Sequence, residues 1–103
     1  MNVQQQIDEQ VKGSKIMLFM KGTPQFPQCG FSGQAVQLLQ SCGVEFGSFD
    51  VLSDDGVRQG IKEYSSWPTI PQLYVDGKFV GGCDIMIELH QNGELQKLVE
   101  STH

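Results

Sequence analysis

The sequence contains few cysteines, few basic residues and no long apolar run. Its three cysteines, Cys29, Cys42 and Cys83, are too few for a small secreted scaffold built on disulfides, which favours a reducing compartment. Its 7 basic side chains against 12 acidic ones give a net charge of -5, which argues against nucleic acid or an anionic membrane as a general partner. The longest apolar run, from Ile16 to Met20, is far shorter than the ~20 residues that span a bilayer.

The remaining composition is that of one globular domain over residues 1–103. Apolar residues make up 39% and charged residues 18%, and with the 12 glycines the apolar share argues against intrinsic disorder. A chain of this length buries roughly 65% of its unfolded surface, which is enough for a core without covalent crosslinks. We therefore expect a single domain with one function.

Glycine and proline divide the chain into short elements. Strands are predicted at 16–20, 44–51, 72–75 and 78–80, and Asp76-Gly77 joins the last two as an antiparallel hairpin. Helices are predicted over 2–11, before Gly43 and from Asp54-Asp55 to the break at 67–71. Two more follow the last strand and are separated by Asn92-Gly93.

This order, α-β-α-β-α-β-β-α-α, places a βαβ half before a half built on a β-hairpin. The bare apolar run 16–20 is typical of a central strand that is covered on both faces. We therefore expect an α/β fold in which helices flank both faces of a four-stranded mixed sheet, the architecture of the thioredoxin fold.

Cys29 is the first candidate for chemistry. It stands where the turn-rich segment 21–28 gives way to a helix, so the helix dipole and free backbone N–H groups would stabilise its thiolate. Lys21 would add a positive charge from the end of the preceding strand. The alternative is a small buried apolar cysteine. Ser32 stands where a dithiol redox motif has its second cysteine, so the partner thiol must come from elsewhere.

Four segments in this order resemble the CGFS-type monothiol glutaredoxins over nearly the whole chain: Lys21-Gly-Thr-Pro24, Cys29-Gly-Phe-Ser32, Trp67-Pro-Thr-Ile-Pro71 and Gly81-Gly-Cys-Asp84. The resemblance implies a thioredoxin-like fold, glutathione as a ligand, and a [2Fe-2S] cluster shared by two protomers. Cys29 and the thiol of one glutathione from each protomer would supply the four thiolates that such a cluster takes.

The resemblance also implies a binding site for the two ends of glutathione. Lys21 and Arg58 match positions expected to meet the glycyl carboxylate, although Arg58 can also be a solvated surface residue. Gly82, with Gly81 before it, lets the backbone come close to the ligand, and the helix that begins at Cys83-Asp84 suits the γ-glutamyl carboxylate. The Asp84 side chain either takes the ligand's α-amino group or caps its own helix.

Two further positions keep an open alternative. Pro71 is expected to be cis and to present the backbone of Ile70 to the cysteinyl part of glutathione, or else it is an ordinary proline at a strand entry. Cys83 either oxidises against Cys29 or contributes only its backbone at a helix start. Cys42 lies on the apolar stripe of its helix and is expected in the core.

Three functions follow from these residues. The first is a carrier that binds a [2Fe-2S] cluster as a cluster-bridged homodimer and passes it to apo iron–sulfur proteins. The second is an enzyme, a glutathione-dependent thiol–disulfide oxidoreductase that removes glutathione from proteins through Cys29. The third, implied by the resemblance alone, is a heterodimer with a BolA-like partner. We expect a cytoplasmic protein, or one of the mitochondrial matrix if a transit peptide has been removed.

Overall fold

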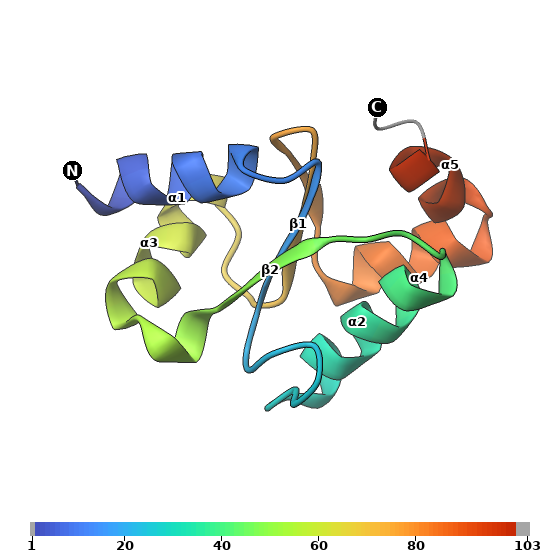
Figure 1. Cartoon of the computed structure of the whole chain (residues 1–103), viewed down its shortest axis with the longest axis horizontal. Helices are drawn as coiled ribbons and strands as arrows, with labels where there is room; N and C mark the ends of the chain where they lie inside the picture. Colours follow the sequence, from blue (N-terminus) through green and yellow to red (C-terminus); the bar gives the residue numbers. More distant parts are fainter. Residues whose placement is uncertain (1, 101–103) are drawn as a thin grey trace.

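The computed structural model describes residues 2–100 and confirms the expected order of helices and strands (Figure 1). No helix in this part of the chain is long and apolar enough to cross a membrane. The elements are α1 (Val3–Lys12), β1 (Ile16–Met20), α2 (Gly30–Ser41), β2 (Gly47–Asp50), the 3-10 turn η1 (Val51–Ser53), α3 (Asp55–Ser65), β3 (Gln72–Val75), β4 (Lys78–Gly81), α4 (Cys83–Gln91) and α5 (Glu94–Glu100).

The strands form one mixed sheet in the order β2-β1-β3-β4. β1 runs parallel to β2 and antiparallel to β3, and Leu18 of β1 lies opposite Leu73 of β3. All five residues of β1 are buried, as predicted for a central strand. Asp76 and Gly77 have φ of 52° and 78°, the left-handed backbone of a type I′ hairpin turn between β3 and β4.

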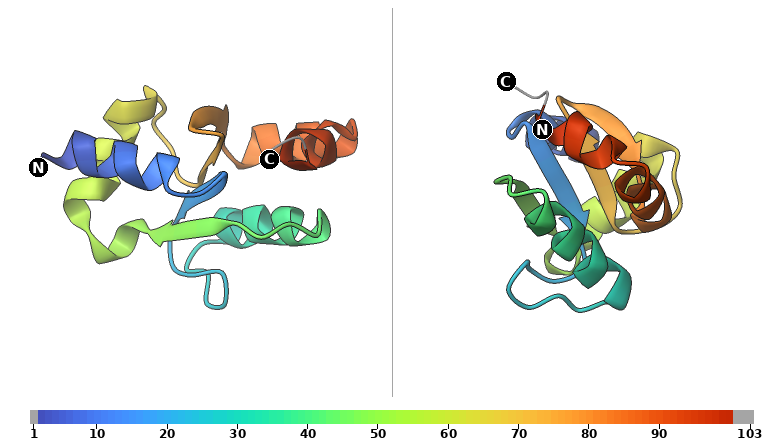
Figure 2. Two further views of the ribbon diagram at one scale, coloured as in Figure 1. Left: turned by 45° about the horizontal axis from the view of Figure 1, so that its top comes forward. Right: turned by 90° about the vertical axis from the view of Figure 1, so that its right-hand side faces the viewer.

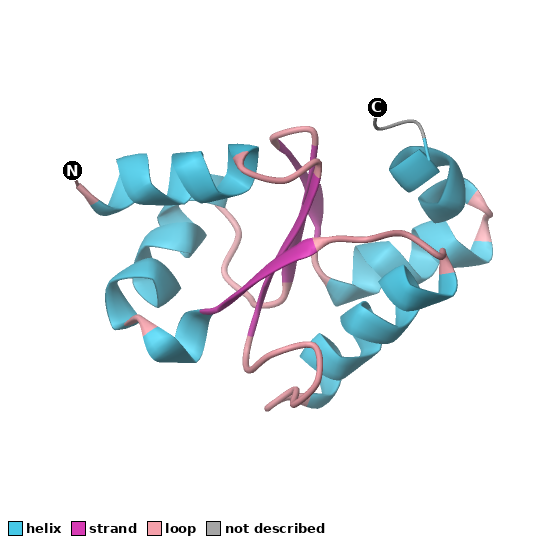
Figure 3. Ribbon diagram, viewed as in Figure 1, coloured by secondary structure: helices cyan, strands magenta, loops and turns pink. Residues whose placement is uncertain are grey.

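Helices cover both faces of this sheet (Figures 2 and 3). Each face has its own apolar core. On one face α1 and α3 pack over the aromatic side chains of the sheet, and on the other α2, α4 and α5 pack over its aliphatic ones. The first core contains Ile7, Val11, Met17, Phe19, Val51, Val57, Ile61, Ile70 and Tyr74; the second contains Ile16, Leu18, Met20, Ala35, Val36, Leu39, Cys42, Leu73, Val75, Met86, Leu95 and Val99.

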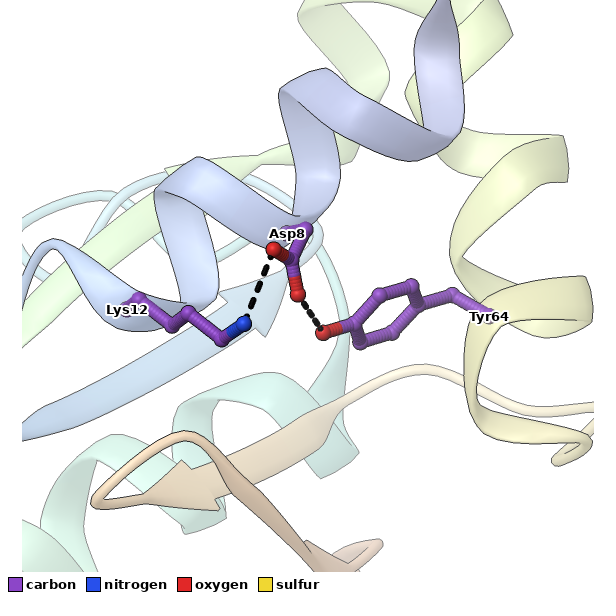
Figure 4. Close-up of polar contacts among 3 residues, drawn as sticks. All are labelled: Asp8, Lys12 and Tyr64. Atoms are coloured by element: carbon purple, nitrogen blue, oxygen red, sulfur yellow. Dashed lines mark hydrogen bonds and ion pairs between the residues drawn. The ribbon is translucent and has the colours of Figure 1, made fainter.

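A polar contact joins α1 to α3 at the edge of the first core. The Tyr64 hydroxyl donates to Asp8 Oδ1 over 2.7 Å, and Lys12 Nζ lies 3.0 Å from Asp8 Oδ2 (Figure 4). The two helices approach closely at Gly60, where an added Cβ would lie 3.0 Å from Ile7 Cδ1. This contact fixes α3, and therefore the segment that follows it, relative to the rest of the fold.

The predicted strand 44–51 is too long. Only Gly47–Asp50 pair with β1, while Val44 and Phe46 pack on the core from an irregular segment. The strand ends because the Asp50 carboxylate caps η1, accepting the N–H of Leu52 at 2.9 Å. Apolar side chains pack equally well from strand or loop, so the pattern of hydrophobicity alone does not mark where pairing begins.

Candidate functional site

Cys29 is the N-cap residue of α2, at the junction that the sequence predicts. Its side chain is half-buried at the start of that helix. Hydrogen bonding by the backbone N–H of Ser32 is the main cause that lowers the pKa of the Cys29 thiol, and partial burial opposes it. The N–H of Phe31 and the charge of Lys21 lower this pKa further. The arrangement favours the thiolate, the form that is the nucleophile and the metal ligand.

Ser32 is fully buried, and its hydroxyl already has a partner. Ser32 Oγ accepts the backbone N–H of Lys21 over 3.0 Å. The carbonyl of Lys21 accepts the N–H of Gln28 over 2.9 Å, so both backbone groups of Lys21 are bonded. Ser32 therefore ties the end of β1 to the first turn of α2, and with it the cation that faces Cys29.

The loop 21–28 is further held at Gly22. Its N–H donates to Asp50 Oδ1 over 2.9 Å, which connects the loop to the end of β2. Gly22 has φ of 89°, and an added Cβ would lie 2.5 Å from the carbonyl oxygen of Phe26. Only glycine fits this turn, because a side chain would meet both the backbone strain and the neighbouring carbonyl.

Cys29 lies in a pocket of about 660 Å³ at the junction of the two halves of the fold. The pocket brings together every predicted site residue except Arg58, along with side chains that the sequence reasoning did not assign. The predicted residues that line it are Lys21, Cys29, Ile70, Pro71, Gly82, Cys83 and Asp84, and the others are Phe31, Lys62, Trp67, Pro68, Thr69 and Ile85.

Arg58 is absent from the residues that line the pocket, and the α3 cation found there is Lys62. The two residues are four positions apart, so they lie about one turn apart on the same side of the helix. This spacing could have identified Lys62 from the sequence, because a lysine one turn along the helix from Arg58 lies on the same side of it. The role of Arg58 stays a prediction.

The segment 67–71 and the start of α4 form another part of the pocket wall. The Ile70–Pro71 peptide bond is cis, as expected from the resemblance. An added Cβ on Gly82 would lie 3.3 Å from both the Pro71 carbonyl oxygen and Trp67 Nε1. Gly82 is the N-cap of α4, so the N-terminus of that helix opens into the pocket, and Asp84 stands in its first turn.

The other two cysteines differ from Cys29. Cys83 is only 7% exposed, with its Sγ 3.7 Å from Gln34 Oε1, and burial followed by the charges of Asp84 and Cys29 raises the pKa of its thiol. Cys42 lies in the core as predicted, and burial raises its pKa too. All three cysteines are free thiols. Within residues 2–100 no three His, Cys, Asp or Glu side chains gather where they could hold a metal ion.

Comparison with known proteins places this site in a family. The family model for glutaredoxin matches residues 16–80, which hold Cys29 and most of the pocket. The chain belongs to the glutaredoxin family. A monothiol glutaredoxin of the cyanobacterium Synechocystis is 63% identical over 94 residues, covering 91% of this chain and 88% of the relative. The CGFS motif at Cys29 and this similarity place the protein among the monothiol glutaredoxins.

Two further relatives extend the comparison of this glutaredoxin. The chloroplastic monothiol glutaredoxin S7 of rice is 56% identical, and the match covers 91% of this chain and 56% of that longer one. The solution structure of reduced poplar apo GrxS14 has a TM-score of 0.84 at 53% identity, over 97% of this chain and 92% of that one. These likenesses confirm the thioredoxin-like fold.

A buckwheat glutaredoxin solved as a complex with glutathione shows the same fold. Its TM-score is 0.86 over 97% of this chain and 89% of that one. At 20% identity the likeness extends to the fold alone.

Proposed function

We propose that this monothiol glutaredoxin binds a [2Fe-2S] cluster as cargo, together with glutathione and a second protomer, and transfers it to apo iron–sulfur proteins. One observation carries the proposal: Cys29 is a half-buried thiol of lowered pKa, while the resolving position is Ser32, whose buried hydroxyl is already bonded to Lys21. The site therefore offers a single thiolate to an external ligand and has no neighbouring thiol in its own motif with which to close a disulfide.

The pocket suits an anionic tripeptide such as glutathione. Lys21 and Lys62 put two cations on its border, and the N-terminus of α4 offers backbone N–H groups for a second carboxylate. Trp67 and Ile70 give it an apolar wall against which a peptide backbone can lie. The charge and shape of the pocket thus support glutathione as the ligand whose thiol is brought beside Cys29.

The cysteines fit a cluster shared between two chains. Cys83 is buried and its pKa is raised, and Cys42 lies in the core, so each chain offers one thiolate at Cys29. A [2Fe-2S] cluster takes four thiolates, which two chains and two glutathione molecules supply. This count motivates the proposed homodimer.

The second candidate is a glutathione-dependent thiol–disulfide oxidoreductase, and the lowered pKa of Cys29 favours it equally. The Cys29 thiolate would attack the glutathione sulfur of a glutathionylated protein, forming a Cys29–glutathione disulfide and releasing the protein thiolate. A second glutathione thiolate would then attack the glutathione sulfur of that disulfide, releasing Cys29 and glutathione disulfide. We place this activity second because the motif has Ser32 where a dithiol redox site has its second cysteine.

Anaerobic reconstitution with iron and sulfide, with and without glutathione, tests the two functions on one sample. Visible absorption and gel filtration should show a [2Fe-2S] spectrum in a dimer peak only when glutathione is present. Cys29→Ser should abolish the spectrum, whereas Cys42→Ala, which removes a thiol buried in the core, should keep it. A colourless monomer that reduces glutathionylated substrate would instead establish the oxidoreductase.

Compartment and partners belong to the same proposal. We propose the cytoplasm, with the mitochondrial matrix as the alternative for a trimmed chain. Cell fractionation with an antibody to the native protein distinguishes them. A BolA-like partner stays a prediction, and co-purification of the cluster-loaded protein tests it.

A further inference from the structure

Gln72 is a polar side chain in the first position of the central strand β3, and it is 0% exposed. Ser32 is the other buried polar residue in the described part of the chain, and its bond to Lys21 explains its burial. An amide taken out of water is costly unless all of its hydrogen-bonding groups find partners. The buried Gln72 amide therefore needs a hydrogen-bond partner for its nitrogen and for its oxygen.

Each polar atom of that amide is bonded. Gln72 Nε2 donates to the carbonyl oxygen of Trp67 over 3.1 Å and to that of Thr69 over 3.2 Å. Gln72 Oε1 accepts the hydroxyl of Tyr74 over 2.9 Å. Carbonyl oxygens only accept, so the atom that faces Trp67 and Thr69 must be the nitrogen, which settles the orientation of the amide.

The two carbonyls belong to the segment 67–71, which forms part of the pocket wall. Residues 67–71 all line the pocket. The N–H of Trp67 donates to the Lys62 carbonyl of α3 over 3.1 Å, whereas Pro68 and Pro71 have no N–H to donate. Gln72, by contrast, pairs through its backbone with Phe19 in the middle of the sheet. Its side chain thus connects the wall to the two central strands of the sheet.

The wall must be held closely because Trp67 lies against the start of α4. With Trp67 Nε1 only 3.3 Å from the place where a Cβ on Gly82 would lie, a small outward or inward shift of the segment changes the width of the pocket at the N-terminus of α4. A displacement of the backbone that Gln72 bonds would therefore change the distance between Trp67 and the N-terminus of α4.

We propose that Gln72 is a positioning residue for the ligand pocket: its buried amide, bonded to the Trp67 and Thr69 carbonyls, sets the width of the groove that receives glutathione. The inference rests on the proposed glutathione binding. Gln72 does not line the pocket, so it acts through the wall and not on the ligand.

Gln72→Met tests this inference, because methionine has a similar length and no hydrogen-bonding amide. Trp67 is the sole tryptophan of the chain, so its fluorescence reports on the wall directly. We expect its emission to shift to longer wavelength and its quenching by acrylamide to increase. Binding of glutathione should weaken about tenfold, because two part-buried carbonyls lose their shared donor and the wall is no longer held. The pKa of Cys29 should stay unchanged, because the groups that lower it belong to Ser32, Phe31 and Lys21 and not to residues 67–72.

Tyr74→Phe is the matched control. It removes the hydroxyl that donates to Gln72 Oε1 and leaves both bonds to the wall in place. Trp67 fluorescence and glutathione affinity should stay close to those of the wild type. A folded Gln72→Met protein with wild-type quenching, or with a glutathione affinity within about twofold of wild type, overturns the inference.

The wild-type protein provides a second measurement in case Gln72→Met does not fold. Both side-chain amide hydrogens of Gln72 should exchange slowly with solvent, and their NMR signals should move when reduced glutathione is added. Exchange at the rate of an exposed glutamine would refute the positioning role. If the wild type binds no glutathione, the proposed function fails, while Trp67 quenching and Gln72 exchange still decide whether the amide holds the wall.

Discussion

Replacing Ser32 with alanine tests whether the hydroxyl beside Cys29 is a structural bond. The change removes the acceptor of the Lys21 N–H, which lies 3.0 Å from Ser32 Oγ at a fully buried side chain. A buried donor left without a partner costs about 1–3 kcal/mol. In a domain of about 100 residues each kcal/mol lowers the melting temperature by about 4–8 °C. We therefore expect Ser32→Ala to melt at least about 4 °C below the wild type, measured by circular dichroism.

The same variant should affect the thiol much less than the stability. The backbone N–H of Ser32 is the main cause of the lowered pKa of Cys29, and alanine keeps that N–H, whereas the hydroxyl is the smallest of the causes. The pKa of Cys29, measured as the midpoint of its alkylation rate by iodoacetamide against pH, should thus be only slightly higher than in the wild type. A large rise in this pKa would mean that the hydroxyl, and not the backbone, stabilises the thiolate.

Ser41→Ala is the matched control on the same helix. Ser41 is exposed, and its hydroxyl donates to the Leu38 carbonyl within α2, so its loss should change the free energy of unfolding by no more than about 0.5 kcal/mol. Equal melting temperatures for the Ser32 and Ser41 variants would refute the reasoning, because they would show that the Lys21 amide finds another acceptor.

Three further changes test the loop and the α1–α3 contact. Gly22→Ala should destabilise the protein by at least about 1 kcal/mol in urea unfolding, because φ is 89° and its Cβ would lie 2.5 Å from the Phe26 carbonyl oxygen; an unchanged midpoint would contradict this. Burial and then the hydrogen bond to Asp8 raise the pKa of Tyr64 from 10.0 to about 12. The contribution of Tyr64 to stability is therefore present below pH 10.0 and lost as the pH rises toward 12. Tyr64→Phe should reduce that alkaline loss, and urea midpoints that fall as steeply as in the wild type would argue against it. Hydrogen bonds from Tyr64 and then Lys12 lower the pKa of Asp8, so its contribution is present above the unfolded carboxyl pKa and lost as pH falls through the folded one. Asp8→Asn should flatten the corresponding part of the acid unfolding curve, and an identical curve would show that Asp8 does not take part.

The order of elements was predictable because each boundary has a local chemical signal. Asp76-Gly77 has the backbone freedom that a tight hairpin needs, and the structure has the turn there. Residues 16–20 are apolar on both faces, and they form the buried central strand β1. The bounds of β2 were not predictable in this way. At its start Val44 and Phe46 pack on the core without pairing. Its end is set by the Asp50 carboxylate bonding to Leu52 and to Gly22, which is 28 residues away in the sequence.

The site residues that could be predicted are those whose residue type has a local structural preference. Cys29 before a helix and Gly82 before another were placed correctly by helix-capping logic and by the family motifs. Thr69 and Phe31 were not assigned, because a threonine and a phenylalanine are common everywhere and only the folded arrangement brings them to the pocket. Lys62 was not assigned either, although it lies one turn along α3 from Arg58. Gln72 gave no signal of its role either, since its partners are backbone carbonyls.

The pocket draws one border from the first half of the fold and the other from the second half. Lys21 and Cys29 come from the βαβ half, whereas residues 67–71 and the start of α4 belong to the rest of the chain. A ligand that contacts both borders binds the native chain and not the unfolded one, so it raises the free energy of unfolding by mass action. Loss of that ligand would then lower the free energy of unfolding and raise the unfolded fraction that proteases can cleave.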